Sequence, residues 1–164
     1  GAVVERRRLP MIAEAHALSP ILFATEAYAT WEAEIEAAPG KMFAEILNRF
    51  RGGRDIMARE FIRAWQALRG YRAAWLEETA GYDAVVLPTA PNLPPKLDRL
   101  ASDGDYYVTE NLLTLRNTRV GNLMGLPALT LPTGVPSTGI MFLTPPMTEA
   151  RLLRLGAAAE AALA

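Results

Sequence analysis

Apolar residues in the first half of the chain recur at steps of three and four, the spacing that places them on one face of an α-helix. This pattern predicts helices over about residues 19–38, 42–50 and 56–79. Ser19, which is followed by proline, is expected to cap the first helix, and Asp55 the third. Aromatic residues at helical spacing in the third helix indicate core packing rather than a face for bases or a cofactor. The stripe of the first helix is Ile21, Ala24, Tyr28, Trp31 and Ile35, and that of the third is Met57, Phe61, Trp65, Leu68, Tyr71 and Trp75.

The second half carries short apolar runs that are bounded by turn residues. Because the run at 83–88 does not alternate with polar residues, it predicts a strand buried on both faces, and the run at 128–131 predicts another buried strand. We expect a further strand at 139–143 and another at the very start, over residues 2–5.

The segments between these strands are predicted from their prolines, glycines and charges. Prolines at 88, 91, 94 and 95 exclude regular structure up to about Leu97, and residues 98–105 read as an exposed acidic loop. Residues 109–124 predict one or two short helices, interrupted near Asn117 and Gly121. Thr148 is expected to cap a last helix. That helix should run to about Leu163 and turn Leu152, Leu153, Leu155, Ala159 and Leu163 inward.

Four strands with helices between and after them predict an α/β fold, part of a mixed β-sheet layered with helices. Four strands at these positions need further strands beside them, so the order of elements suits the end of a larger sheet. We therefore expect residues 1–164 to be a single domain or the C-terminal portion of a larger one, cut from something longer. The helical part covers about 19–80, and the sheet with its pocket wall about 82–164.

Composition narrows the classes of function. Among 164 residues, 51% are hydrophobic and the net charge is −1, which excludes intrinsic disorder and gives no electrostatic reason to expect a nucleic-acid partner. No apolar run approaches the ~18 residues that a membrane span needs. The chain has no cysteine, which excludes disulfides and thiol nucleophiles and favours a cytoplasmic location.

The rarer residues restrict the chemistry further. A Ser-His-Asp hydrolase would need His16, the only histidine, beside Ser19, Ser102 or Ser137. One histidine and no cysteine leave few of the usual ligands for zinc, so we expect no metal site. His16 is interpreted as a partly buried or surface side chain.

Four stretches, taken in order, resemble the C-terminal part of the amidase signature family, which hydrolyses carboxylic amides. Residues 82–91 (YDAVVLPTAP) resemble the family's strand-then-loop segment. Residues 117–127 (NTRVGNLMGLP) resemble its N-L-x-G-L-P segment, and 128–134 (ALTLPTG) the strand and glycine that follow. Residues 145–153 (PPMTEARLL) are similar to the helix that closes these enzymes.

The resemblance implies a nucleophilic serine that is activated by a second serine on a cis peptide and by a lysine. A Gly/Ser-rich segment supplies the two serines and the oxyanion N–H groups, and no such segment occurs in residues 1–164. We therefore assign no catalytic residue, expect the catalytic half to lie upstream of Gly1, and expect the isolated chain to be inactive. The family's mechanism needs no metal or organic cofactor.

The resemblance gives this portion the role of scaffold and pocket wall around a small-molecule amide. Polar side chains next to strand ends can present an amide or an arginine fork to such a substrate. Asn122 could instead bond loop backbone, and Arg119 a carbonyl or a carboxylate. The short connection 135–139 and the basic run 116–119 depart from many relatives, which leaves substrate choice open. The substrate-binding candidates are Thr89, Asn92, Asn117, Thr118, Arg119 and Asn122.

A second hypothesis comes from a different class of protein. The chain could be a non-catalytic α/β interaction module that oligomerises through its sheet edge, as a homodimer for example. It predicts a stable oligomer of the chain alone, which a size measurement would detect. Neither hypothesis includes a nucleic acid or a membrane as partner.

Overall fold

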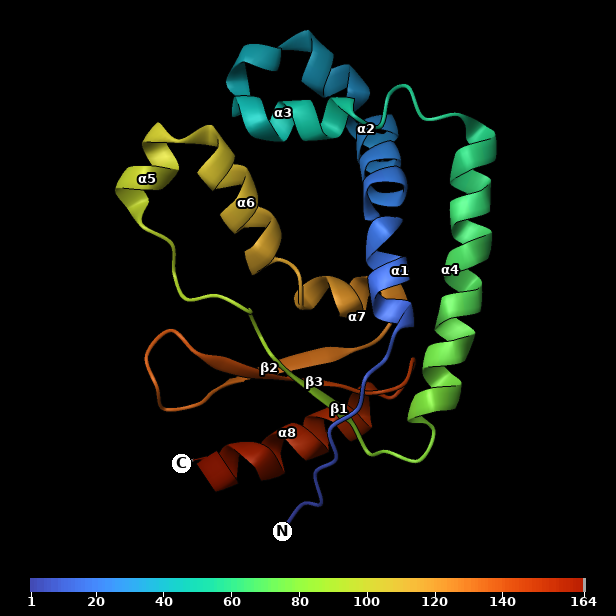
Figure 1. The fold of residues 1–164 in the computed structure, drawn as a ribbon, viewed down its shortest axis with the longest axis vertical. Coiled ribbons are helices and arrows are strands. Elements are labelled where there is room, and N and C mark those ends of the chain that lie inside the picture. The colour runs from blue at the N-terminus through green and yellow to red at the C-terminus, as the bar shows by residue number, and fades with distance from the viewer. Residues whose placement is uncertain (164) are drawn as a thin grey trace.

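The fold is a small antiparallel sheet with helices on both sides, and the structure, a computed structural model, describes residues 1–163 of it. Strands β1 (Val85–Pro88), β2 (Ala128–Pro132) and β3 (Gly139–Leu143) pair in the order β1-β3-β2. Figure 1 shows most helices above the sheet and helix α8 (Glu149–Leu163) beneath it, where it contacts β2 and β3. The predicted α/β class, with helices layered on a sheet, is confirmed.

Seven helices and a 3-10 turn make up the layer above the sheet. Among them α4 is the longest and runs along one side of the molecule, with α1 and α2 next to it (Figure 1). Helices α5 and α6 form a separate arm on the opposite side. Their bounds are α1 Met11–Ala17, α2 Ser19–Ala37, the 3-10 turn Pro39–Lys41, α3 Ala44–Arg51, α4 Ala58–Thr79, α5 Leu97–Ser102, α6 Gly104–Thr114 and α7 Thr118–Met124.

The core lies where α1, α4 and α7 meet the upper face of the sheet. Leu68 and Trp75 of α4 pack there with Leu123 of α7 and with Met141 and Leu143 of β3. The aromatic residues of α4 thus pack in the core, as predicted. Met57, the first residue of the predicted stripe, lies just before the helix and is exposed. In α2, Leu22, Tyr28 and Ile35 are buried, whereas Trp31 was expected inside and is 53% exposed.

The predicted strand at residues 2–5 is wrong. Residues 1–9 have no regular structure, and Val3 and Val4 are 93% and 87% exposed. A strand needs a neighbouring strand for its backbone groups, and the three described strands pair only with one another. The segment is fixed by side chains instead, since the Tyr82 hydroxyl donates to Glu5 (2.6 Å) and accepts from Arg7 (3.0 Å).

Residues 98–105 form helices rather than the predicted acidic loop. The Asp103 carboxylate accepts the Tyr106 N–H at 2.9 Å and so caps α6, while Arg99 of α5 reaches the same carboxylate at 3.1 Å. The carboxylates that suggested a loop are therefore helix-terminal groups. The predicted interruption near Asn117 is confirmed, because α6 ends at Thr114 and α7 begins at Thr118. The predicted interruption near Gly121 is wrong, because Gly121 lies inside α7.

Two predicted caps are also wrong. Leu18 has helical backbone angles and joins α1 directly to α2, so Ser19 lies inside the helix, with its hydroxyl buried and without a partner among residues 1–163. Helix α4 begins after Met57, not at Asp55, and the Glu60 carboxylate accepts the Met57 N–H at 3.0 Å. Thr148 does precede the last helix, and its carbonyl accepts the Arg151 N–H at 3.0 Å.

The strands are not buried on both faces within the described chain. Val85, Leu87 and Met141 face the helical core, while Phe142 shares the lower face with Leu129. Val86, on that lower face, is 45% exposed because α8 covers β2 and β3 only. On α8, Leu152 is buried and Leu155 and Ala159 half-buried, whereas Leu153 and Leu163, which were expected to point inward, are exposed. Nowhere in residues 1–163 is there a helix that combines the length and the apolar character of a membrane span.

Candidate functional site

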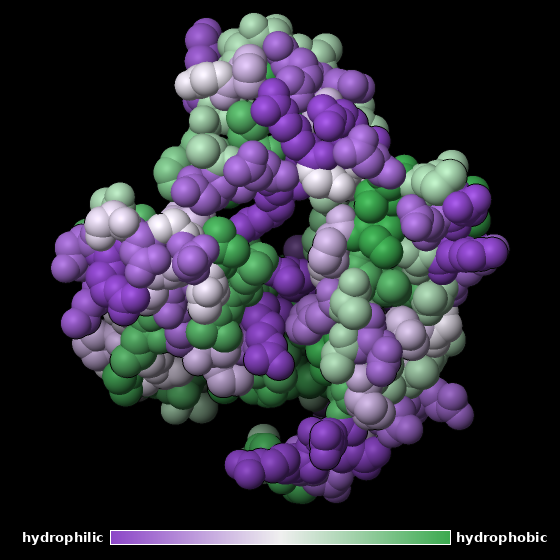
Figure 2. Space-filling model, turned by 45° about the horizontal axis from the view of Figure 1, so that its top comes forward, coloured by the Kyte–Doolittle hydropathy of each residue, from purple (hydrophilic) through white to green (hydrophobic). Residues whose placement is uncertain are grey.

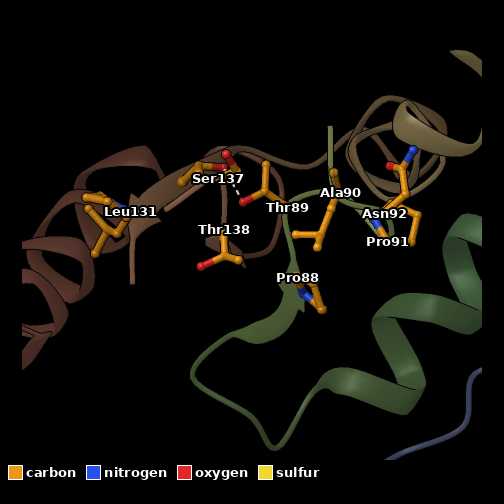
Figure 3. A pocket seen from close by; sticks show the side chains of 12 residues that line it. Pro88, Thr89, Ala90, Pro91, Asn92, Leu131, Ser137 and Thr138 are labelled. Carbon is orange, nitrogen blue, oxygen red and sulfur yellow. Dashed lines mark hydrogen bonds between the residues drawn. The ribbon is translucent and has the colours of Figure 1, made fainter. Parts of the chain in front are cut away.

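A pocket of about 510 Å³ opens at one end of the sheet. Its walls come from the end of β1 and the Pro-rich loop after it, the end of β2, and the connection between β2 and β3 (Figure 3). Prolines and leucines supply apolar walls, and four hydroxyl groups and one amide supply the polar groups. The polar side chains are those of Thr89, Asn92, Thr130, Ser137 and Thr138.

The centre of this pocket depends on the absence of a side chain at Gly139. The Thr89 N–H donates to the Gly139 carbonyl at 2.9 Å, and the Thr89 hydroxyl donates to the Thr130 hydroxyl at 3.3 Å. A Cβ atom on Gly139 would lie 2.7 Å from Thr89 Oγ1 and 3.1 Å from Thr130 Cγ2. Glycine in β3 thus allows threonines from the two outer strands to meet across it, which places two hydroxyls side by side.

Asn92 lines the pocket, but its side chain is held by α6. Its amide nitrogen donates to Glu110 Oε2 at 2.7 Å and to Thr114 Oγ1 at 3.1 Å. In Figure 3 the side chain points toward this helix and away from Thr89. Both amide hydrogens are used, so in this structure Asn92 fixes the Pro-rich loop.

Asn117 and Thr118 act on the backbone near the pocket rather than on its interior. The Asn117 amide donates to the Pro88 carbonyl at 2.7 Å and so ties the start of α7 to the end of β1. The Thr118 hydroxyl donates to the Leu115 carbonyl at 3.2 Å, a local contact at the start of the helix. Neither residue lines the pocket.

Arg119 and Asn122 of α7 also lie outside the pocket lining. Asn122 is exposed, and the Arg119 side chain is half-buried. Burial, and after it the positive charge of Arg49, holds the pKa of Arg119 below its ordinary value. Within residues 1–163 the Arg119 guanidinium has neither a carboxylate within 4.0 Å nor a hydrogen-bond partner.

His16 lies in α1, half-buried beside α7. Burial lowers the pKa of its imidazole below 6.5, with the charge of Arg119 as the second cause, so the ring is neutral at pH 7. Its Nε2 atom is buried without a partner in the described chain. None of the side-chain hydrogen bonds of residues 1–163 joins His16 to a serine, so no Ser-His pair forms there.

The sequence pointed to the loop after β1 and missed the residues that face it. Thr130 was missed because β2 was interpreted as a buried strand, although Leu129 and Leu131 on either side of Thr130 already imply that its side chain points to the opposite face. Thr138 and Gly139 had no signal beyond their place in a turn. In the described part of the chain no cluster of three His, Asp or Glu residues is placed to hold a metal ion.

Comparisons with known proteins address the family directly. A family model described as Amidase matches residues 1–153. The 2-amino-5-chloromuconic acid deaminase of Comamonas testosteroni is 29% identical over 120 residues, which are 71% of this chain and 26% of that protein. A glutamyl-tRNA(Gln) amidotransferase subunit of Nocardia farcinica is 32% identical over 114 residues, which are 66% of this chain and 20% of that protein. The chain thus spans about a quarter or a fifth of the length of these relatives.

Solved structures share the fold at low sequence identity. An amidase crystal structure matches with a TM-score of 0.82 and 21% identity, over 99% of this chain and 38% of that chain. The 6-aminohexanoate cyclic dimer hydrolase complexed with substrate gives 0.76 and 21%, with the same coverage. Seven of the twelve residues that line the pocket lie in segments 82–91 and 128–134, two of the four stretches that carried the resemblance in the sequence. Since the family model matches nearly the whole chain, the chain belongs to the amidase family.

Proposed function

We propose that this chain supplies the scaffold and the pocket wall of an amidase that hydrolyses the C–N bond of a small-molecule amide. The observation that carries the proposal is the pocket at the sheet end, with the Thr89 and Thr130 hydroxyls 3.3 Å apart between proline and leucine walls. Hydroxyl groups both donate and accept, so such a pair suits an amide, which offers a carbonyl oxygen and N–H hydrogens. The family match supports the reaction type.

The reaction we propose for the intact protein is the family's two-step acyl transfer. A serine oxygen attacks the amide carbon, the C–N bond breaks, and ammonia or an amine leaves with a proton. Water then attacks the ester carbon, which releases the carboxylic acid and restores the serine. We place this serine and its activating serine and lysine outside residues 1–164, and we assign no catalytic residue within them.

The experiment uses the full reading frame that encodes these residues and measures ammonia or amine release from a panel of small amides. We expect turnover, with a raised KM in the variants Thr89→Val and Thr130→Val because each removes one hydroxyl from the pocket. Thr30→Val, on the exposed surface of α2, is the control and should leave KM unchanged. Absence of turnover across the panel would contradict the proposal.

Two narrower statements are part of the same proposal. The cysteine-free sequence favours a cytoplasmic location. A homodimer remains our expectation for assembly, to be checked by light scattering of the purified full chain. The family match and the structural neighbours support the hydrolase and give no support to a non-catalytic interaction module.

A further inference from the structure

One wall of the pocket carries a hydroxyl group that the described chain does not use. Ser137 lies in the connection between β2 and β3 and lines the pocket (Figure 3). It is exposed, and none of the hydrogen bonds of residues 1–163 involves its hydroxyl. A serine hydroxyl can donate one hydrogen bond and accept two. All of this capacity is available to a ligand in the pocket.

The other polar side chains of the pocket already have partners within the chain. The Thr89 hydroxyl donates to the Thr130 hydroxyl at 3.3 Å. Both amide hydrogens of Asn92 are held by side chains of α6. The Thr138 hydroxyl donates to a backbone carbonyl of its own turn at 2.9 Å. Among the polar side chains that line the pocket, Ser137 is thus distinguished by having no partner in residues 1–163.

The backbone at Ser137 is one that glycine would adopt more easily. Residues 135–138 form a turn, closed by a 3.2 Å hydrogen bond from the last N–H to the first carbonyl. Pro136 is the second residue of this turn, and Ser137, the third, has a φ of +62°. These features are typical of a type II turn, whose third residue is usually glycine because a Cβ atom crowds the backbone there. The same connection does use glycine at its other positive φ, at Gly134.

A residue that conflicts with its local backbone, at the wall of a pocket, indicates a role in function. The turn also holds the side chain in place. Pro136 restricts the backbone before Ser137, and Thr138 after it is fixed by two bonds to the Val135 carbonyl, from its N–H and from its hydroxyl. A group that is fixed before a ligand arrives loses little conformational entropy on binding. The turn therefore presents a preorganised hydroxyl.

The lining of the pocket also restricts the kind of group that it suits. None of the described residues that line it carries a charge. Charge is common elsewhere, since 21% of the chain is charged and Figure 2 shows strongly hydrophilic residues in every part of the face that it draws. A charged group that enters the pocket would lose water without gaining a counter-ion. An uncharged polar group, such as a hydroxyl or a carboxamide, fits this lining.

We infer that Ser137 is a specificity-determining residue, which binds an uncharged polar group of the substrate while the Thr89–Thr130 pair binds the amide. The inference rests on the proposed amidase function and adds the substrate class: a small amide that also carries a hydroxyl or a second carboxamide. Hydrogen bonding to such a group selects against an apolar analogue of the same shape, which leaves the serine hydroxyl without a partner.

The test measures the preference of the full reading frame for two probes over their apolar isosteres. Glycolamide is paired with propionamide, in which a methyl replaces the hydroxyl, and succinamide with isocaproamide, in which two methyls replace a carboxamide. We expect a preference of about threefold to tenfold for the polar member of at least one pair, beyond the statistical factor for the symmetric succinamide. The preference is the ratio of kcat/KM where the probes are hydrolysed, and the ratio of calorimetric affinities where they are not.

Two variants of Ser137 separate its hydroxyl from its backbone, and a third variant is the control. Ser137→Ala and Ser137→Gly should both abolish the preference, because each removes the hydroxyl. Met147 is matched to Ser137 in backbone, with a φ of +61°, but it lies outside the pocket lining and is 89% exposed. Met147→Gly should therefore keep the preference. Thermal unfolding should show an equal or higher melting temperature for both glycine variants, since each relieves a left-handed backbone.

Each result against these expectations overturns a stated part of the inference. Equal use of both members in both pairs, or a preference that survives Ser137→Ala, would show that the hydroxyl does not select the substrate. A lower melting temperature of Ser137→Gly would show that the hydroxyl already binds another group of the protein. Succinamate preferred to succinamide would refute the uncharged class. An active amidase without the preference refutes only the inference, whereas a protein that shows the preference in binding but hydrolyses no amide refutes only the proposed function.

Discussion

Gly139 and Thr89 approach so closely that no other residue fits at position 139 without moving Thr89. The Gly139 carbonyl accepts the Thr89 N–H at 2.9 Å, and a Cβ atom on Gly139 would lie 2.7 Å from the Thr89 hydroxyl oxygen. This contact joins β3 to the loop after β1. It therefore fixes both the backbone and the hydroxyl pair that define the pocket.

Gly139→Ala is expected to raise KM for the amide and to destabilise the fold by about 1–3 kcal/mol, because the added methyl group pushes Thr89 away from Thr130. Gly81→Ala is the control, since a Cβ there would meet nothing within 4 Å. Urea unfolding and steady-state kinetics of both variants provide the check. An unchanged KM in Gly139→Ala would show that the Thr89–Thr130 pair does not contribute to substrate binding.

Asn117 and Asn122 offer a matched pair of substitutions on one helix. Asn117→Ala removes the 2.7 Å hydrogen bond to the Pro88 carbonyl and leaves that acceptor without its side-chain partner. We expect a loss of about 1–2 kcal/mol in the free energy of unfolding. Asn122→Ala, at an exposed position, should change it by less than about 0.5 kcal/mol. Chemical denaturation measures both, and equal effects would show that the bond to Pro88 contributes nothing.

The elements that sequence patterns predicted well are those that their own residues determine. Long periodic stripes defined α2 and α4, and proline and glycine located the loop after β1 and the breaks around it. The errors have a tertiary origin. Residues 2–5 have a strand-like composition but no neighbouring strand, and Ser19 looked like a cap because the helix before it, α1, carries too weak a pattern to be noticed.

The residues of the candidate site divide in the same way, into those that local sequence could identify and those that only tertiary packing brings together. Thr89 and Asn92 could be assigned to a pocket because they follow a strand directly, and both do line it. Arg119 was selected for its charge but lies outside the pocket lining. Thr130 was not selected, yet its hydroxyl meets that of Thr89, which lies 41 residues earlier in the chain. Sequence spacing carries no information on such a meeting.

Gly53 is predicted to be the least replaceable glycine outside the pocket. A Cβ atom there would lie 2.1 Å from the Ala24 carbonyl oxygen and 2.5 Å from the Thr25 nitrogen, both in the backbone of α2. Since a helix backbone cannot move aside as a side chain can, Gly53→Ala should cost about 3 kcal/mol or more. Gly70→Ala, in the open on α4, should instead stabilise the protein by up to about 1 kcal/mol. Thermal unfolding should show a lower melting temperature for Gly53→Ala and an equal or higher one for Gly70→Ala. A Gly53→Ala protein as stable as the wild type would contradict the close packing of Gly53 against the backbone of α2.

The neutral His16 predicts how stability depends on pH. Its pKa in the folded protein is lowered from 6.5 by burial and by the charges of Arg119 and Arg116. In the unfolded chain the imidazole binds its proton near pH 6.5, so below that pH the unfolded state holds more protons than the folded one. Stability is therefore complete above pH 6.5 and declines as the pH falls toward the lower folded-state pKa. The slope from this one group is at most about 1.4 kcal/mol per pH unit.

His16→Asn should remove this decline between pH 7 and 5, because asparagine does not titrate. The lowered pKa values of Glu36 and Asp103 act at more acidic pH, below about 4.5, and leave the window to His16. Urea unfolding at pH 7, 6 and 5 for the wild type and the variant gives the comparison. If the two proteins lose stability in parallel over this range, His16 is not held neutral by burial beside Arg119, and the electrostatic description of the α1–α7 contact is wrong.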